Sequence, residues 1–80
     1  MIKELDVVIL TRDLPELGIP AGTSGTVVFD HEVANPEPAF EVELMTDDGK
    51  TIDVVTLNAS DLRLATAREM DEMRQVAMSR

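Results

Sequence analysis

The fold of this chain is decided by one stretch, Gly18-Ile19-Pro20-Ala21-Gly22-Thr23-Ser24-Gly25-Thr26-Val27-Val28. Glycine adopts backbone angles that other residues avoid, and proline fixes one of its two angles. A β-branched run follows the glycines at once, and β-branched residues favour strands. The stretch therefore predicts a shaped loop that leads into a strand, with Gly22 and Gly25 setting backbone angles and Val27 entering the core.

The glycines of this stretch also suggest a phosphate-binding loop, which the neighbouring residues argue against. Such a loop needs the N-terminus of a helix after it and usually a lysine. Here a strand is expected next, and no lysine is near. We therefore expect Gly18, Gly22 and Gly25 to be structural residues, and we expect no cofactor.

Short strands are expected on both sides of this stretch. Apolar and β-branched composition, bounded by Gly, Pro, Asn and Asp, predicts strands over residues 5–11, 25–30, 39–45, 51–57 and 62–64. Residues 39–45 alternate cleanly, with Phe40, Val42 and Leu44 on one face and Glu41 and Glu43 on the other. This alternation predicts a strand with one buried face. The long connection of residues 12–24 is expected to fold back onto the core through Leu14, Leu17 and Ile19.

The turn after residue 45 is predicted to be the three-residue loop Asp47-Asp48-Gly49, with the glycine left-handed. This choice places Leu44 opposite Ile52 and keeps the apolar side chains on one face. A two-residue loop at residues 48–49 would mix the two faces. The chosen register also places Glu43 opposite Asp53 on the solvent side.

The last fifteen residues have the pattern of an amphipathic helix. Thr66 and Glu69 have the spacing of a capping box, which predicts a helix over residues 67–79. Met70, Met73 and Ala77 fall on one stripe. Three interpretations stay open. The stripe can pack on the chain's own barrel, it can bind another chain, including a second copy, or the segment can be a frayed tail, since isolated helices of this length are marginal in water.

The charge of the chain limits its partners. The formal net charge is −9, and residues 1–65 hold all of it while residues 66–80 are balanced. An acidic body repels nucleic acid and anionic lipid and favours either solubility alone or a basic partner. The absence of cysteine fits a reducing cytoplasm. We see no signal peptide, and the longest apolar run, residues 7–10, is too short to cross a membrane.

Catalytic and metal-binding groups are scarce in this sequence. His31 is the single histidine, and we expect it to be an exposed loop residue rather than a metal ligand. Thr23, Ser24 and Ser60 have no base within reach by sequence. We therefore predict that the protein is not an enzyme and holds no metal.

The outward row Glu41, Glu43 and Asp53 is the first candidate binding surface. Like charges opposite one another on a sheet are destabilising, so solvent or a cationic partner must offset them. The predicted partner-binding residues are thus this acidic row together with the stripe Met70, Met73 and Ala77.

The motifs resemble a known family over about residues 1–64. They are Leu5-Asp6-Val7-Val8, Asp13-Leu14-Pro15, Gly18, Ala21-Gly22, Gly25-Thr26-Val27-Val28, Glu41-Val42-Glu43, Asp48-Gly49-Lys50-Thr51, Val55-Thr56-Leu57 and Asp61-Leu62-Arg63. Together they resemble domain-of-unknown-function family 4926, a family of small bacterial proteins. The order of elements resembles a small SH3-like five-stranded barrel. We expect this mainly β barrel over residues 1–65, followed by the helix extension of residues 66–80.

The resemblance carries no established activity, and it suggests that some relatives are small partners of other proteins, including toxin-like ones. We expect a non-catalytic protein-binding module, such as an antitoxin-like partner or accessory protein of a neighbouring gene product. One alternative is an accessory domain of a hydratase or hydrolase complex, since the barrel also resembles the smaller subunit domain of nitrile hydratases. Another is a nucleic-acid-binding barrel, which the net charge of −9 argues against.

Overall fold

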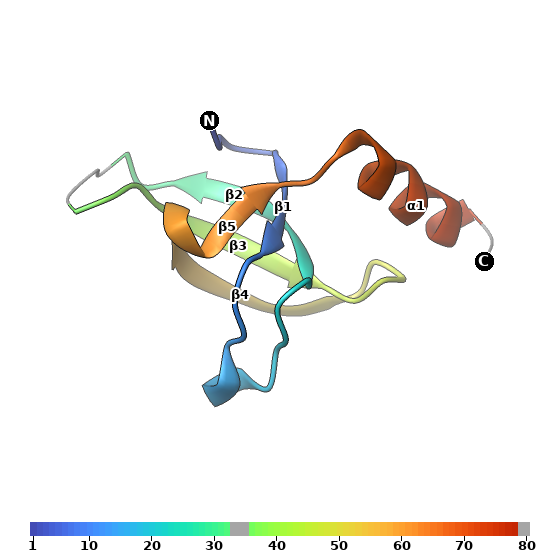
Figure 1. Cartoon of the computed structure of the whole chain (residues 1–80), viewed down its shortest axis with the longest axis horizontal. Helices are drawn as coiled ribbons and strands as arrows, with labels where there is room; N and C mark the ends of the chain where they lie inside the picture. The colour runs from blue at the N-terminus through green and yellow to red at the C-terminus, as the bar shows by residue number, and fades with distance from the viewer. Residues whose placement is uncertain (33–35, 79–80) are drawn as a thin grey trace.

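The protein is mainly β, with one C-terminal helix (Figure 1). The structure, a computed structural model, describes residues 1–32 and 36–78. Its elements in chain order are β1 (Val7–Leu10), η1 (Pro15–Leu17), β2 (Ser24–Asp30), β3 (Ala39–Met45), β4 (Thr51–Asn58), η2 (Ala59–Asp61), β5 (Leu62–Leu64) and α1 (Ala67–Met78). The strands form one five-stranded antiparallel sheet in the order β4-β3-β2-β1-β5. The predicted class and the five predicted strands are confirmed.

The core lies against one face of the bent sheet. The predicted alternation of residues 39–45 is confirmed, because Phe40, Val42 and Leu44 are buried and the residues between them are half-exposed. The other buried apolar residues of the cluster are Val8, Leu10, Leu14, Ile19, Val27, Leu57 and Leu62. None of the α1 side chains that the structure describes belongs to this cluster, so the core is built by the sheet and the connection between β1 and β2.

The sheet stays open, and the predicted barrel is therefore not confirmed. A barrel needs a hydrogen-bonded ladder between the first and last strands of the sheet. In the described residues β4 pairs with β3 and β5 pairs with β1, and no ladder joins β4 to β5. At three residues, β5 is also the shortest strand, so it presents little backbone for a further ladder.

The connection between β1 and β2 folds back as expected. Leu14 and Ile19 pair in an isolated bridge and are both buried, while Leu17, at the end of η1, is exposed. Gly22 has φ +91°, so the prediction that it sets a backbone angle is confirmed. For Gly25 the prediction is wrong, because its φ is not positive. A Cβ there would lie 2.7 Å from Cγ1 of Val42, so this glycine is needed for space.

The β3–β4 turn is confirmed, but the register beyond it is wrong by one residue. Gly49 has φ +86°, and the amide of Thr46 donates to the carbonyl of Lys50 at 2.8 Å, which closes the three-residue loop. The ladder then shifts between Leu44 and Met45, so that Leu44 pairs with Asp53 and not with residue 52. A bulge of this kind adds an extra residue to one strand, and a repeating pattern of side chains does not reveal it.

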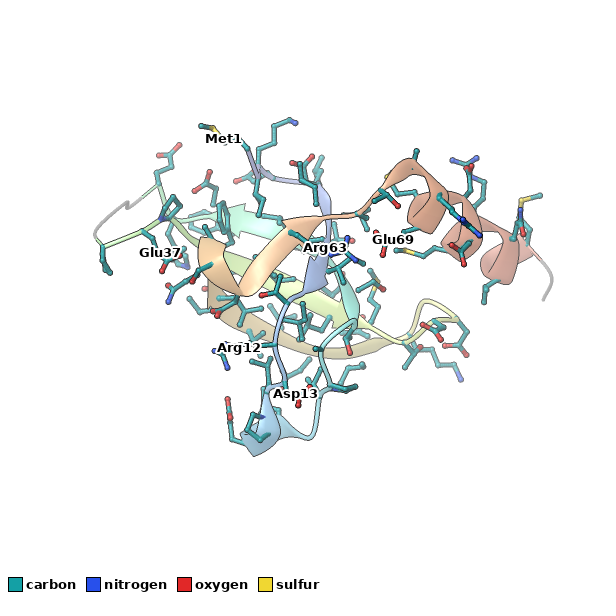
Figure 2. All side chains as sticks on the ribbon, viewed as in Figure 1. Met1, Arg12, Asp13, Glu37, Arg63 and Glu69 are labelled. Carbon is teal, nitrogen blue, oxygen red and sulfur yellow. The ribbon has the colours of Figure 1, made fainter. Side chains whose placement is uncertain are left out.

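The helix α1 begins at the predicted capping box. The amide of Glu69 donates to the Thr66 hydroxyl at 3.1 Å, and the amide of Thr66 donates to the Glu69 carboxylate at 2.9 Å. Arg63 of β5 forms two hydrogen bonds with the same carboxylate, at 2.8 and 2.7 Å (Figure 2). These bonds fix the start of α1, and the rest of the helix extends away from the sheet (Figure 1).

Candidate functional site

The solvent-facing side of β2, β3 and β4, which we call the outer face, carries the candidate site. Side chains alternate along a strand, and residues paired across a ladder share a face. Because Phe40, Val42 and Leu44 point into the core, Glu41 and Glu43 point outward. Their ladder partners and side-chain contacts complete the outer face, which consists of Thr26, Phe29, His31, Glu41, Glu43, Thr51, Val54 and Thr56.

Glu41 lies at the centre of a hydrogen-bond cluster on this face. Its Oε2 accepts a bond from the Thr56 hydroxyl at 2.7 Å and lies 2.6 Å from Nε2 of His31. The bond from Thr56 and then the bond from His31 hold the pKa of Glu41 below its usual value of 4.5. A carboxylate held in this way stays ionised in moderately acidic solution and keeps a fixed position.

The position of His31 corrects the expectation of a simply exposed loop histidine. Its side chain is 35% exposed and contacts Glu41, which lies ten residues further along the chain. The ring of Phe29 packs edge-on against the imidazole, with 5.1 Å between ring centroids. No sequence pattern indicates this contact, because the β2–β3 ladder that brings Glu41 close to His31 is a non-local feature.

Glu43 is placed differently from the prediction. It pairs with Val54, and its carboxylate accepts a hydrogen bond from the Thr51 hydroxyl at 2.6 Å. Asp53 pairs with Leu44, and its Oδ1 accepts the amide of Val54 at 2.8 Å. The predicted opposition of Glu43 and Asp53 is therefore wrong, and the structure brings Glu41 and Glu43 together on the outer face without Asp53.

Apolar side chains accompany the two carboxylates, and sequence reasoning missed them. Phe29, paired with Glu41, is 50% exposed, and Val54, paired with Glu43, is 49% exposed. Phe29 is directed outward because the β2–β3 register shifts between Val27 and Phe29. Phe29 is plain in the sequence of β2, but no sequence pattern indicates the register shift that turns its ring towards solvent.

The negative charge of the chain is concentrated in one segment of the sequence, which includes the two carboxylates of the outer face. Residues 13–49 contain no Lys or Arg and nine acidic residues, namely Asp13, Glu16, Asp30, Glu32, Glu37, Glu41, Glu43, Asp47 and Asp48. The other seven of the sixteen acidic residues match the seven Lys and Arg of the chain. The net charge of −9 is thus the charge of this one segment, which supplies β2, β3 and the loops around them.

The ion pairs of Lys and Arg are formed with acids that lie away from the outer face. Five Lys or Arg side chains pair with acids from outside residues 13–49, in the pairs Lys3–Asp6, Arg12–Asp61, Arg63–Glu69, Arg68–Glu72 and Arg74–Asp71. Among the described residues, neither Glu41 nor Glu43 forms an ion pair with Lys or Arg. A cationic surface would therefore meet carboxylates that have hydrogen-bond donors beside them but no lysine or arginine.

The second predicted surface is the stripe on α1. Met70 is exposed, and Met73 is half-buried beside Asp47 of the β3–β4 turn. The side chain of Ala77 lies outside the described residues. The structure thus places the first half of α1 close to the turn, and whether another chain covers the stripe stays a prediction.

Two of the hydroxyl residues that were considered and rejected as nucleophiles, Thr23 and Ser60, form hydrogen bonds within the loops. The Thr23 hydroxyl donates to the carbonyl of Pro20 at 2.7 Å. The amide and hydroxyl of Ser60 both donate to the carboxylate of Glu37, at 2.6 and 3.0 Å. These bonds shape the loop before β2 and the turn before β5.

A hollow of about 440 Å³ opens beside the core, away from the outer face. The buried ring of Phe40 and the side chains of Ile2, Pro38 and Ala59 line it, with Asp30 among its polar residues. Asp30 pairs with Phe40, which points into the core. The hollow and the acidic outer face are therefore on opposite sides of the β2–β3 hairpin.

The described ranges contain neither a membrane-spanning helix nor a cluster of metal-binding side chains. No helix within residues 1–32 and 36–78 is long and apolar enough to cross a membrane. No group of three or more His, Asp or Glu side chains in the same ranges is arranged to hold a metal ion.

Comparison with known proteins identifies the family. The profile of the family described as domain of unknown function (DUF4926) matches residues 4–64, which is most of the chain and all five strands. The chain belongs to the DUF4926 family. No curated protein and no solved structure shows significant similarity to it. The match ends before α1, so the helix lies outside the part that the family profile covers.

Proposed function

We propose that this DUF4926 protein is a non-catalytic protein-binding module whose outer face docks on a basic surface of another protein. The observation that carries the proposal is the combination on one sheet face of half-exposed Phe29 and Val54 with Glu41 and Glu43. These residues belong to or border a segment of charge −9 that contains no Lys or Arg.

The chemistry of the outer face suits a protein partner. Apolar groups at the centre of an interface supply affinity when water is removed, while charged groups supply orientation and a faster encounter. Thr51 and Thr56 hold the carboxylates of Glu43 and Glu41 in place before binding. Pre-arranged groups lose little conformational freedom on docking, so the ordering cost of association is small.

The same charge distribution argues against nucleic acid as the partner. A nucleic-acid surface needs cations for phosphates and aromatic rings for stacking. The face carries one exposed phenylalanine next to two carboxylates. A basic protein, such as a toxin-like product of a neighbouring gene, fits these groups better.

Two finer features belong to this proposal. We regard the open sheet as a variant of the SH3-like barrel, because a long first connection, a tight β3–β4 turn and the short 3-10 turn η2 before β5 occur in the same order. A bacterial cytoplasmic setting for the complex also belongs to the proposal, and the absence of cysteine fits a reducing compartment.

The experiment is capture of the partner with matched variants. The tagged chain is expressed in its native host, and captured proteins are identified by mass spectrometry. The double variant Glu41→Gln and Glu43→Gln removes two carboxylates from the outer face. The control variant Glu4→Gln and Glu16→Gln removes two exposed carboxylates from elsewhere. Thermal melts establish that all three proteins are folded.

We expect one basic protein to be captured by the wild type and by the control variant. Its affinity for the outer-face variant should fall about tenfold, which is about 1.4 kcal/mol. Binding should also weaken between 50 and 300 mM salt, roughly as the Debye length falls. Equal affinities of the two double variants for the captured protein would refute the outer face as the docking surface.

A further inference from the structure

The strand β4 forms a free edge of the sheet. It is eight residues long, and no strand pairs with its far side in the described part of the chain. Edge strands present unpaired backbone groups, so proteins usually shorten them or interrupt them with proline or lysine. Residues 51–58 contain neither proline nor lysine. The other edge strand, β5, is only three residues long.

One acidic side chain covers this edge. Asp53 pairs with Leu44, whose side chain is 1% exposed, yet Asp53 itself is exposed. Its carboxylate therefore turns out of the core, and its Oδ1 accepts the amide of Val54 at 2.8 Å. An amide that donates to its own neighbour is not donating to β3, so the Val54 amide faces the free side of β4. The carboxylate of Asp53 thus occupies a donor that a further strand would need.

We propose that the β4 edge accepts an extended strand of the basic partner and that Asp53 closes this edge until the partner binds. The inference rests on the proposed function for the basic character of the partner, and it adds the mode of binding. A lysine or arginine of the incoming strand pairs with Asp53 and draws its carboxylate from the Val54 amide. That amide then donates to a carbonyl of the new strand.

The geometry also defines the pattern of the incoming strand. A side chain of the incoming strand that lies beside Val54 is on the same face of the sheet as Val54, which is about half exposed. The next side chain of the incoming strand points to the opposite face, the face of Asp53. An alternation of apolar and basic residues therefore places apolar groups beside Val54 and a cation beside Asp53. A second copy of this chain fits poorly, because two copies paired at β4 bring further negative charge to the same edge.

The test uses synthetic peptides and the full chain labelled for NMR. The first peptide is acetyl-Lys-Val-Lys-Val-Lys-Val-Lys-amide, and the second has glutamate in place of lysine. The third has the same composition as the first with its three valines in one block. Backbone amide shifts and hydrogen exchange of Val54 and Thr56 are measured at each peptide concentration.

We expect saturable binding of the alternating basic peptide, with slower exchange of the Val54 amide by about tenfold or more. The acidic peptide should not bind, and the block peptide should bind more weakly. The inference is overturned if the basic peptide does not saturate, if its shifts lie away from β4, or if the block peptide binds equally well. The Val54 amide of the free protein could also exchange more slowly as the protein concentration rises. That result would identify a second copy of this chain as the occupant of the edge and would also overturn the inference.

Variants separate this inference from the proposed outer face. Asp53→Asn keeps an oxygen acceptor but removes the charge, and should lower the affinity for the alternating basic peptide about two- to fivefold. Val54→Pro removes the edge amide together with the Val54 side chain and should abolish binding, and the β3–β4 ladder should persist because a proline is tolerated on the free side of an edge strand. Val54→Ala removes the same side chain from the outer face but keeps the amide, so this matched control should still bind the peptide. If Val54→Pro does not melt cooperatively, the test is whether the alternating basic peptide slows hydrogen exchange of the Val54 amide in the wild-type protein.

The outer-face double variant, Glu41→Gln with Glu43→Gln, serves as the control. It should bind the alternating peptide within about fivefold of the wild type, as expected for surface charges that the strand does not contact. Loss of the captured partner by this variant, together with unchanged peptide binding by Val54→Pro, would refute the edge and leave the outer face supported. Retention of the captured partner by the outer-face variant, together with loss of peptide binding by Val54→Pro, would refute the outer face and leave the edge supported.

Discussion

Replacement of Gly25 by alanine tests the packing that brings β2 against β3. An alanine Cβ at this position would lie 2.7 Å from Cγ1 of Val42, 2.9 Å from the carbonyl oxygen of Glu43 and 3.1 Å from Cδ2 of Leu44. The first and third neighbours are buried side chains, and the second is backbone within a ladder. None of them can withdraw freely, so the strand itself must move.

The expected cost follows from two opposing effects. Because φ of Gly25 is not positive, alanine loses less chain entropy on folding and gains about 0.4–1 kcal/mol. Overpacking a closely packed core costs typically about 1–3 kcal/mol, and the upper end applies because one contact is with backbone. We expect a net destabilisation of about 2 kcal/mol. A chain of this size has a total stability of about 4–12 kcal/mol, so the loss is a large fraction.

The assay is urea unfolding together with thermal melts. A loss of about 2 kcal/mol should lower the melting temperature by roughly 8–16 °C for a domain of this size. Val42→Ala removes the closest atom, so the double variant should be more stable than the sum of the single variants predicts, by about 0.5 kcal/mol or more. A Gly25→Ala protein as stable as the wild type, or strictly additive variants, would refute the packing argument.

Three further predictions follow from the turn, the helix cap and the helix itself. Gly49→Ala should cost about 1 kcal/mol in urea unfolding, because its φ is +86° and a Cβ there meets no other atom within 4 Å; an unchanged midpoint would contradict this. Hydrogen bonds from Arg63 and then from the Thr66 amide lower the pKa of Glu69 to about 2. Because the folded pKa is depressed, the stabilisation is complete above the usual value of 4.5 and is lost as pH falls towards 2, so circular dichroism at 222 nm should show helix loss in that range in the wild type but not in Glu69→Gln. Deletion of residues 66–80 should leave a cooperative melt, since none of the described α1 side chains belongs to the core cluster; a chain that no longer melts cooperatively would show that the helix is part of the folding unit.

Local patterns in the sequence were sufficient for several elements of this fold. The strict alternation of residues 39–45 can bury only one face, so it defines β3. A left-handed glycine at position 49 and a capping box at Thr66 and Glu69 act through neighbouring residues alone. Such signals depend on backbone angles and short-range hydrogen bonds, which the sequence specifies directly.

The candidate site depended on features that are not local. Its two carboxylates could be identified from the alternation, but their partners Thr51, Thr56 and His31 could not, because these come from other strands or loops. The register of β4 was predicted one residue away, so Asp53 was assigned to the wrong neighbour.

The sequence by itself therefore determined which segments form strands, where the helix begins and where the charge is concentrated. Only the tertiary structure decided which side chains meet on the outer face and that Asp53 turns to the free edge of β4. The physical reason is that the register shifts at Val28 and Ile52 each insert an extra residue into one strand of a ladder, and no periodic pattern in one strand records them. The opening stretch shows the same division, because Gly22 follows from its own backbone angle, whereas Gly25 is required by the side chain of Val42 on the neighbouring strand.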